Sequence, residues 1–400
     1  MNISMLLDNE FKADPRVNNE AMMLAKAGHQ VHIICLNFGK QKPFEQKGNI
    51  YIHRLFIPEK IKKTIFLLQF IVPLFQWFWF LKSRNIIRKY KIGAIHAHDL
   101  YMARPALMLK RFLHLSVILD LHENYPAALD AYTWAHKFPA RWIYKAEWWI
   151  NIEFRLLSGA DAIIVLSRTY KDTLRSKYPS LSNEKFFIYP NVPVLQEFNK
   201  YPTYNGHYEF MKEGFWMVYF GVIGKRRGIL DVLRALRIAD NPSIHLLLVG
   251  PIDKHDKEEF SIELEYFSQS KQVVYFPWKD ISELPSMLYY AHLALSPLVK
   301  NPQHESGVAN KVFQYMLMGK ALLVSDCEPQ VELVEEFGCG LSFEASNLDD
   351  LVGKITWAYD NQEKLDEMGA RGRRAVLEKY NSDYQYQPLL DFYNRISLHG

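Results

Sequence analysis

The sequence predicts an α/β protein made of two doubly wound domains, each with a parallel sheet covered by helices. The chain has 400 residues, which is more than one hydrophobic core usually fills. Short apolar runs alternate with helical patterns in both halves, as is typical of parallel sheets. A polar and aromatic stretch without either periodicity, residues 196–214, lies between the halves. We expect this stretch to connect two domains.

The composition narrows the class of protein. Hydrophobic residues make up 49% of the chain, enough for two cores, and the formal net charge of +4 is too small to indicate a nucleic-acid partner. The three cysteines, Cys35, Cys327 and Cys339, lack metal-type spacing, so we expect small core residues in a reducing compartment. An acidic residue precedes any long apolar run, which predicts no signal peptide and a cytoplasmic location, including the cytoplasmic face of a membrane.

The first half begins as a strand, helix and strand. Apolar runs at 3–7 and 31–36 flank a helical pattern at 15–27, with Pro15 at its first turn and Gly28 after its end. The loop DNEFKADPR contains no glycine, so the GxGxxG fingerprint of dinucleotide-binding dehydrogenases is absent. Further strands are expected at 93–97, 117–121, 162–167 and 186–188. We expect this first domain to span residues 1–195.

The second half repeats the pattern over residues 215–379 and forms the second domain. Its expected strands are 216–220, 245–249, 273–276, 293–298 and 321–324, and helices are expected at 229–239, 309–318 and 348–379. A last helical piece, 384–396, lies in a C-terminal segment, 380–400, that we expect to return to the first domain.

One segment of the first half does not fit a plain βα-domain. Residues 60–91 contain eight Lys or Arg and no Asp or Glu, and they flank an apolar core at 64–81. Two interpretations remain open: a buried helix of the first domain, and attachment to an anionic membrane surface. The tryptophan-rich residues 132–154 favour attachment. A bilayer span is disfavoured, because it would cut the domain in two.

Polar side chains follow two successive strands of the first domain. His98 and Asp99 follow the strand at 93–97, and His122 and Glu123 follow the strand at 117–121. A single polar strand end is more often structural than catalytic. Two successive ends that carry histidine and carboxylate favour a functional site.

Two loops of the second domain combine backbone N–H groups with cations. GVIGKRRG, residues 221–228, follows a strand and precedes a helix, so Lys225, Arg226 and Arg227 could bind a phosphate at the helix N-terminus. The loop at 301–309 precedes the helix that carries Lys311. Taken alone, the 221–228 loop could be a solvated basic turn. Taken alone, the 301–309 loop could simply precede an ordinary capped helix. Both loops on one sheet predict a diphosphate clamp.

The helix at 309–318 has two distinct faces. Val308, Val312 and Met316 recur every four residues and are expected in the core. Lys311 and Gln314 fall on another face. The sequence lacks HExxH, paired CxxC, GxSxG, kinase and Asp-x-Asp metal motifs. These absences favour a nucleoside diphosphate bound by Arg, Lys and helix dipoles without a metal.

Several segments together resemble the family 4 glycosyltransferases of the GT-B fold. They are DPRVNNEAMMLAKAGHQVHIICL, IHAHD, DLHENYP, ADAIIVLS, the 221–228 loop and VANKVFQYMLMGKALLVSD. The resemblance implies two Rossmann-like domains that face each other across a cleft. It also implies a hexosyltransferase that uses a UDP- or GDP-linked sugar as substrate, without cofactor or metal, usually with retention of configuration. The donor would bind the second domain and the acceptor the first.

The resemblance also assigns roles to individual residues. The implied catalytic residues are His122, Arg227 and Lys311. The implied donor-binding residues are Gly221, Lys225, Arg226, Arg227, Glu305, Ser306, Gly307, Val308, Ala309, Lys311 and Gln314. The implied acceptor-binding residues are Asp14, Arg16, His98, Asp99 and Glu123.

The sequence departs from the family pattern at Gln314. Many members carry two glutamates seven residues apart, the second of which binds the nucleotide ribose. Gln314 takes the apparent second position, and either Glu305 or Ser306 takes the first. A glutamine still forms hydrogen bonds but carries no charge, so donor affinity is in question.

The function expected from the sequence is a membrane-associated glycosyltransferase that builds a surface polysaccharide or a lipid-linked glycan. The peripheral membrane contact would use residues 60–91 and 132–154, and no nucleic acid is expected as a partner. Two alternatives remain: a nucleotide-sugar epimerase of the GT-B fold, and a catalytically weakened scaffold at the membrane.

Overall fold

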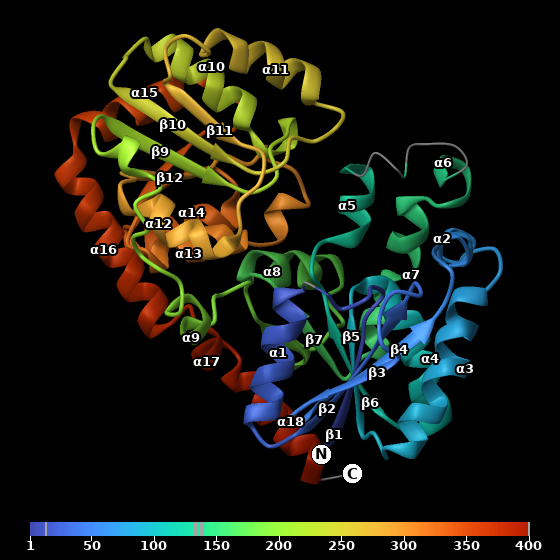
Figure 1. The fold of residues 1–400 in the computed structure, drawn as a ribbon. Coiled ribbons are helices and arrows are strands. Elements are labelled where there is room, and N and C mark those ends of the chain that lie inside the picture. Colours follow the sequence, from blue (N-terminus) through green and yellow to red (C-terminus); the bar gives the residue numbers. More distant parts are fainter. Residues whose placement is uncertain (13, 132–134, 136–139, 399–400) are drawn as a thin grey trace. The chain divides into compact units, whose positions relative to one another are not determined.

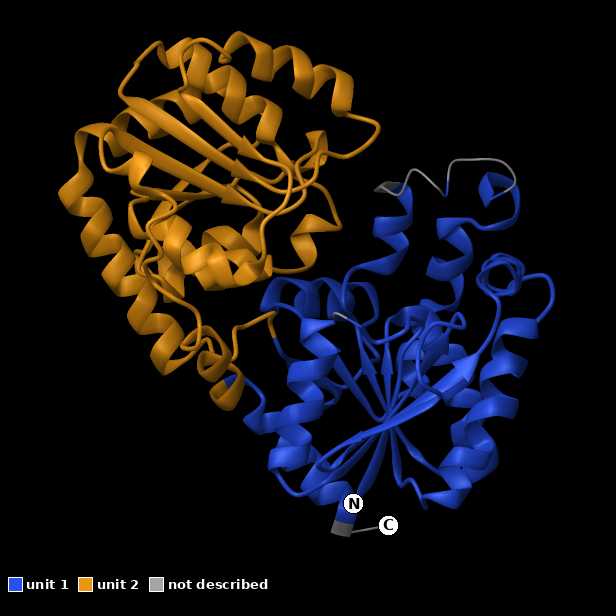
Figure 2. Ribbon diagram, viewed as in Figure 1, with its two compact units in different colours: residues 1–189, 385–400 blue, residues 190–384 orange. Residues whose placement is uncertain are grey.

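The protein is described here by a computed structural model that covers residues 1–12, 14–131, 135 and 140–398 (Figure 1). The chain divides into two compact units, Met1–Tyr189 with Gln385–Gly400, and Pro190–Tyr384 (Figure 2). Each unit has a mainly parallel sheet flanked by helices. The predicted fold class, two doubly wound α/β units, is confirmed.

The first unit contains an eight-stranded sheet in the order β3-β4-β2-β1-β5-β6-β7-β8. Only the β3–β4 pair is antiparallel; the other neighbouring strands of this sheet are parallel. The strands are β1 (Asn2–Leu6), β2 (Gln30–Asn37), β3 (Phe44–Lys47), β4 (Ile50–Phe56), β5 (Ala94–His98), β6 (Ser116–Asp120), β7 (Ala162–Val165) and β8 (Phe186–Ile188). β3 and β4 were not predicted, because His53 and Arg54 interrupt the apolar pattern of β4 although both side chains are buried.

Helices cover both faces of this sheet (Figure 1). α3 packs against α4, and α4 packs against β5 and β6. The helices are α1 (Pro15–Lys26), α2 (Glu59–Leu67), α3 (Leu74–Lys89), α4 (Ala103–Leu113), α5 (Tyr125–Ala131), α6 (Ala140–Ile143), α7 (Ala146–Gly159), α8 (Arg168–Lys177) and α18 (Gln387–Leu398). α18 belongs to this unit although it is far away in sequence: the Tyr393 hydroxyl lies 2.9 Å from Nδ1 of His96 in β5.

The basic and apolar segment, 60–91, forms two helices, α2 and α3, which Pro73 separates. Phe75 and Trp79 of α3 are fully enclosed in the core of the first unit. In the part of the chain that the structure describes, no helix is both long enough and apolar enough to cross a bilayer. Of the second predicted attachment segment, residues 132–134 and 136–139 lie outside the described residues, and Trp149 of α7 is buried.

The second unit contains a six-stranded, fully parallel sheet in the order β11-β10-β9-β12-β13-β14. Its strands are β9 (Phe215–Phe220), β10 (Ile244–Val249), β11 (Val273–Phe276), β12 (Leu293–Ser296), β13 (Ala321–Ser325) and β14 (Gly340–Phe343). β14, a four-residue edge strand that starts with glycine, was not predicted.

Helices also cover both faces of the second sheet. α10 packs against α15 on one face, and α13 packs against α16 on the other. The helices are α9 (Leu195–Phe198), α10 (Ile229–Ala239), α11 (Lys257–Tyr266), α12 (Leu284–Tyr289), α13 (Asn310–Leu317), α14 (Glu328–Phe337), α15 (Leu348–Asp360), α16 (Gln362–Glu378) and α17 (Ser382–Gln385). The helix expected at 348–379 is two helices, because the chain breaks at Asn361. Val308, Val312 and Met316 are buried as predicted. The three cysteines are also buried, and they are free.

Candidate active site

In the first unit, the carboxyl ends of β5 and β6 bring together two of the predicted histidines. His98 ends β5, and His122 follows β6 by two residues. Nδ1 of His98 lies 3.1 Å from Nε2 of His122. Both rings converge on Asp120, whose Oδ2 lies 3.3 Å from His98 and 2.8 Å from His122. Asp120 was not predicted as a site residue, although a carboxylate at the end of the apolar strand SVILD was a signal for it.

Arg16 fixes the position of the Asp120 carboxylate. It lies in the first turn of α1, and its Nε and Nη2 donate to the two Asp120 oxygens at 2.8 and 2.6 Å. Its Nη1 donates to the backbone oxygen of Tyr189 at 2.9 Å. Burial of the Asp120 carboxylate opposes its charge, but Arg16 and His122 hold its pKa well below the ordinary value. Arg16 therefore supports the predicted catalytic histidine through Asp120.

The electrostatic surroundings of His122 favour its protonated form. Burial alone would lower the pKa of the imidazole, but the carboxylates of Asp99 and Asp120 raise it to about 9. Oδ1 of Asp99 lies 3.7 Å from Nδ1 of His122 on the side opposite Asp120. Burial holds the pKa of His98 below its ordinary value. At neutral pH the pair is one imidazolium, His122, beside one neutral ring.

A second layer of polar side chains lies beneath this pair. His96 stacks on His98 with ring centroids 4.5 Å apart, and its Nε2 lies 3.2 Å from Glu20. Glu20 is four residues after Arg16 on α1, and burial, together with Asp120, raises its pKa well above the ordinary value. This layer was not predicted, although the four-residue spacing on one helix face was a signal for Glu20.

Four of these residues could in principle hold a metal ion. Ligand atoms of Glu20, His96, His98 and Asp120 lie within 4.8 Å of one another. However, the Arg16 guanidinium binds Asp120 and approaches Glu20 to 3.3 Å. A metal ion there would meet a fixed positive charge, so the donor set suits Arg16 better than a metal.

The other predicted acceptor residues have different surroundings. Asp14 is the N-cap of α1, and its side chain accepts from the N–H of Val17 at 3.2 Å. Asp99 has a positive φ of 72° and accepts from the Tyr101 hydroxyl at 2.8 Å. Asp99 and Glu123 line a pocket of about 300 Å³ in the first unit. Asp99 and Glu123 are therefore near each other, whereas Asp14 stabilises a helix end.

In the second unit, glycines bring two loops into contact at the carboxyl end of the sheet. Gly228 has φ of +69°, and a Cβ there would lie 1.7 Å from the carbonyl oxygen of Pro297, just beyond β12. A Cβ on Gly250 would lie 2.0 Å from the oxygen of Gly221. Only glycine permits these approaches. The 221–228 loop is thus held against the loop that follows β12.

Three predicted cations have different positions in these loops. The backbone oxygen of Arg226 accepts from Val299 at 3.2 Å, and its Nη1 donates to Gln303 at 3.3 Å. Arg227 lies close enough to Lys311 to repel its charge. Lys225 instead forms an ion pair with Glu259 of α11. Arg226 and Arg227 thus belong to the contact between the two loops, whereas the Lys225 side chain is turned to α11.

Lys311 lies in the first turn of α13 with its Nζ 3.5 Å from the centroid of the Tyr219 ring. Within the described residues its ammonium has no carboxylate partner. Burial, and then repulsion from Arg227, hold the pKa of Lys311 well below its ordinary value. The N-cap of α13, Ala309, has no side chain that could accept from the first N–H groups. Cations and N–H groups here are suited to an anion.

The remaining predicted donor residues take mostly structural positions. Oε2 of Glu305 accepts from the N–H of Glu328 at the start of α14, 3.0 Å away. The Ser306 hydroxyl is buried and donates to the oxygen of Gln303 at 2.6 Å, and the Gly307 backbone is extended. Val308 is part of the core. Gln314 is half-buried on α13, and its side-chain amide forms no hydrogen bond with any described residue.

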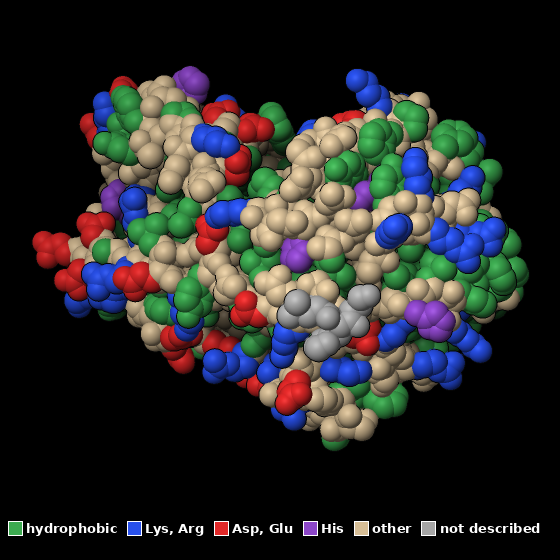
Figure 3. Space-filling model, turned by 90° about the horizontal axis from the view of Figure 1, so that it is seen from below, with side chains coloured by type: hydrophobic (Ala, Val, Ile, Leu, Met, Phe, Trp, Pro, Cys, Tyr) green, Lys and Arg blue, Asp and Glu red, His purple; other side chains and the backbone are tan. Residues whose placement is uncertain are grey.

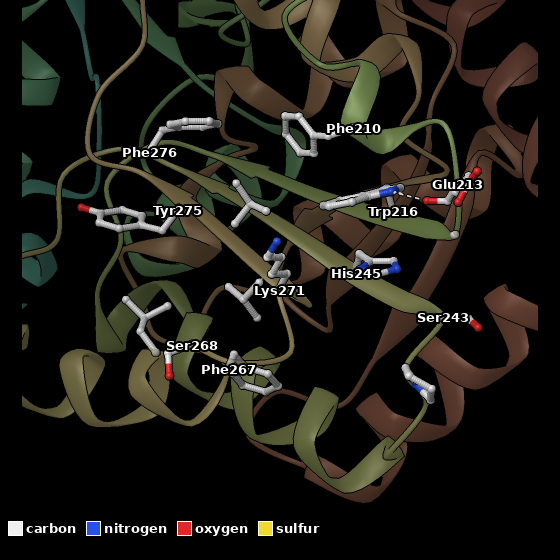
Figure 4. Close-up of a pocket in the computed structure, with 15 residues that line it drawn as sticks. Phe210, Glu213, Trp216, Ser243, His245, Phe267, Ser268, Lys271, Tyr275 and Phe276 are labelled. Carbon is white, nitrogen blue, oxygen red and sulfur yellow. Dashed lines mark hydrogen bonds between the residues drawn. The ribbon is translucent and has the colours of Figure 1, made fainter.

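A large cavity of the second unit lies away from these loops. It has a volume of about 950 Å³ and is lined by Trp216 and His245, near the amino ends of β9 and β10, and by β11 (Figure 4). The two rings stack 4.6 Å apart. Open α/β sheets bind ligands at the carboxyl ends of their strands, so this cavity is not the candidate donor site.

We compared the chain with protein-family models, curated sequences and solved structures. Residues 16–192 match the family model Glycosyltransferase Family 4, and residues 205–375 match Glycosyl transferases group 1. A search of curated protein sequences found no match. Together the two models cover most of the chain.

Several solved structures are similar along the whole chain. A sucrose-phosphate synthase from Thermosynechococcus elongatus has 17% identity and a TM-score of 0.78, with all of both chains covered. Anabaena HepE in complex with UDP has 11% identity and a TM-score of 0.73, covering 99% of this chain and 100% of its own. The catalytic domain of Arabidopsis thaliana starch synthase IV, bound to ADP and acarbose, has 11% identity and a TM-score of 0.70, covering 100% of this chain and 98% of its own.

At these identities the structures establish the fold, and the two family models establish the family. The predicted resemblance is confirmed. The chain belongs to the glycosyltransferases, with a family 4 first half and a group 1 second half in the GT-B fold.

Proposed function

We propose that this glycosyltransferase transfers a hexosyl residue from a UDP- or GDP-sugar to a hydroxyl of a glycan or lipid-linked acceptor, with retention and without a metal. The observation that carries the proposal is the partly buried ammonium of Lys311, which has no carboxylate partner among the described residues and lies beside Arg227. Two adjacent cations at a helix N-terminus favour a diphosphate, whose charge would compensate both.

The proposed chemistry depends on stabilising the departing nucleoside diphosphate. Arg226, Arg227, Lys311 and the first N–H groups of α13 would bind its phosphates, so that negative charge develops among fixed cations. The His122 imidazolium in the first unit would interact with the transferring sugar. The family resemblance supports retention of the anomeric configuration. The cationic side chains at the diphosphate site support a reaction without a metal ion, because they supply the positive charge.

The test is a screen of UDP-, GDP- and ADP-sugars, with and without EDTA, in which both nucleotide release and the fate of the sugar are followed. We expect release from a UDP- or GDP-sugar that EDTA does not reduce. An epimerised donor formed without any acceptor would contradict transfer and support the epimerase. If neither UDP nor GDP binds by calorimetry, the scaffold is supported.

Gln314 allows a direct test of the donor site. If its amide contacts the nucleotide ribose, Gln314→Glu should strengthen UDP or GDP binding about threefold to tenfold, because a carboxylate accepts from ribose hydroxyls more strongly. Calorimetry measures the change. The matched control is Gln362→Glu, at the exposed start of α16. Equal donor affinity in wild type and Gln314→Glu would show that this side chain is not at the ribose.

We also propose that the first unit binds anionic lipid at the cytoplasmic face of a membrane through α2 and α3. The outer surface of these helices and of the turn between them combines exposed hydrophobic and basic side chains. They are Lys60, Ile61, Lys63, Ile71, Val72, Leu74, Trp77, Leu81, Lys82, Arg88 and Lys89. Figure 3 shows basic and hydrophobic side chains next to one another at the right of the view, the side on which Figure 1 draws α3. A surface of this kind favours binding to a membrane interface that contains anionic lipid.

Flotation with vesicles tests this lipid contact. We expect the protein to float with vesicles that contain phosphatidylglycerol and to float less in high salt, because salt screens the basic side chains. Trp77→Ser should reduce binding about tenfold, since it removes one large apolar side chain from the interface. Trp278→Ser, at an exposed tryptophan of the second unit, is the control. Protein that stays at the bottom with anionic vesicles would contradict the proposal.

A further inference from the structure

The 300 Å³ pocket of the first unit contains a buried carboxylate that is only half satisfied. Asp8 follows β1, and its side chain is 3% exposed. Its Oδ2 lies 2.7 Å from Nζ of Lys62 in α2. Its Oδ1 has no hydrogen-bond partner among the described residues. Buried carboxylate oxygens are normally hydrogen-bonded, so this atom is suited to a donor that enters the pocket.

The rest of the pocket wall is polar and aromatic. Lys62 lies over the Phe66 ring, with Nζ 4.7 Å from its centroid. Asp99 and Glu123 supply two further carboxylates, and Tyr101 donates to Asp99. The pocket thus offers hydrogen-bond acceptors next to aromatic rings, which suits the hydroxyls and C–H groups of a sugar.

The charge of the wall limits what can bind. Asp8, Asp99 and Glu123 are three acids, and Lys62 is the single Lys or Arg among the described residues that line the pocket. A carboxylate or phosphate inside it would face more negative than positive charge at short range. An uncharged polyol would not face this penalty.

The pocket also adjoins the proposed reacting centre. Asp99, which lines it, has its Oδ1 3.7 Å from Nδ1 of His122. Asp99 therefore contacts both the pocket and the histidine that we place near the transferring sugar. An acceptor hydroxyl in this pocket would lie close to that histidine.

We propose that this pocket holds the acceptor, and that the group bound there is an uncharged sugar ring with a hydroxyl that donates a hydrogen bond to Oδ1 of Asp8. The Lys62 ammonium donates to a ring or hydroxyl oxygen of the same sugar. Acceptors with a carboxylate or phosphate on that ring are rejected. This inference rests on the proposed glycosyl transfer and specifies its acceptor class.

The acid–base behaviour of the pocket agrees with this assignment. Burial raises the pKa of Asp8 to about 6, although Lys62 acts in the opposite direction and Asp99 adds to the rise. Glu123 and Tyr101 also face the pocket. At pH 7.5 Asp8 is ionised and can accept the hydrogen bond. Acceptor binding should weaken as the pH falls through 6.

The experiment measures binding of methyl glycosides to the full chain by saturation-transfer NMR in the presence of UDP or GDP. The probes are the neutral methyl glucoside, mannoside and galactoside, and methyl glucuronide as the anion. We expect at least one neutral glycoside to bind, and the glucuronide to bind at least tenfold more weakly. Asp8→Asn should lower the affinity for the neutral glycoside about tenfold and leave the affinity for the nucleotide unchanged.

The matched control is Asp161→Asn. Asp161 pairs with Lys110 at 2.7 Å, the same length as the Asp8–Lys62 pair, but it precedes β7 at the opposite end of the sheet. If Asp8→Asn unfolds, the pH dependence of the wild type tests the inference instead. The affinity of the wild type for the neutral glycoside should fall about tenfold between pH 7.5 and pH 5. The inference is overturned if no neutral glycoside binds, if the glucuronide binds equally well, or if a folded Asp8→Asn binds like the wild type. Failure of the wild type to bind any nucleotide would instead contradict the proposed function.

Discussion

Replacing Lys311 with Met should lower kcat/KM for the nucleotide sugar about 100- to 1,000-fold, as is typical when one fixed charge is removed from a leaving-group site. The Lys311 ammonium has no carboxylate partner among the described residues and lies beside Arg227. Its loss therefore breaks no ion pair within the described protein, and the effect should fall on the bound diphosphate. Initial rates with the donor identified by the screen measure the change.

The control for this prediction is Lys225→Met. Lys225 lies on the same basic loop, but its ammonium pairs with Glu259 and is largely exposed. We expect less than a threefold change in kcat/KM. Equal losses for Lys225→Met and Lys311→Met would mean that the loops bind the donor in another way.

Calorimetry gives an independent readout at Lys311. Burial and Arg227 hold its pKa low in the free protein, and a bound diphosphate would raise it again. Donor affinity of the wild type should therefore fall as the pH rises, because the amine of the free protein loses its proton more readily than an exposed lysine does. This dependence should be smaller in Lys311→Met.

Replacing His122 with Gln should lower kcat about 100-fold and change the donor KM less than threefold. The reason is the charge of the ring: the neighbouring carboxylates of Asp99 and Asp120 raise the pKa of His122 to about 9 against the effect of burial. A glutamine keeps hydrogen-bonding capacity but loses that charge. Steady-state rates at pH 7.5 measure the loss.

The same substitution predicts a pH-dependent change in stability. The folded pKa of His122, about 9, lies above the ordinary value of 6.5. The stabilisation from the imidazolium is therefore complete below pH 6.5 and is lost as the pH rises through 9. The difference in thermal midpoint between wild type and His122→Gln should be larger at pH 6 than at pH 9.5. His255→Gln, at an exposed histidine, should show no such trend, and a constant difference for His122→Gln would contradict the assignment.

The positions of most strands along the chain were predictable because the strands of a covered parallel sheet are continuous apolar runs. The run at 273–276 and the helix at 229–239 were predicted with the bounds that the structure has. Segments with mixed patterns were not predictable in the same way. At 60–91 the apolar core reads as one long helix, whereas the chain forms two helices on either side of Pro73. The edge strands β3 and β14 were missed because partial exposure weakens their pattern, whereas the edge strand β11 keeps a short apolar run.

The site was predicted only where its residues carry a local signal. His98, Asp99 and His122 stand at or just beyond the carboxyl ends of strands, and Arg227 and Lys311 stand at helix starts. Asp120 and Arg16 are 104 residues apart in sequence, and their bidentate pair depends on the packing of α1 against the sheet. The glycine-free first loop was noted for the dehydrogenase that it excludes. Asp8 in that loop could not be predicted, because its proposed function depends on Lys62 and on a pocket that forms only when distant segments pack together.

The contact between Tyr393 and His96 joins residues 297 positions apart. During synthesis, the ribosome completes the whole second unit before α18 emerges. Until then, the sheet that carries His96 and His98 lacks one of its covering helices, and its buried ring face is open to solvent or to chaperones. A truncation before residue 385, although distant in sequence, would therefore damage the first unit and its histidine site more than the nucleotide loops.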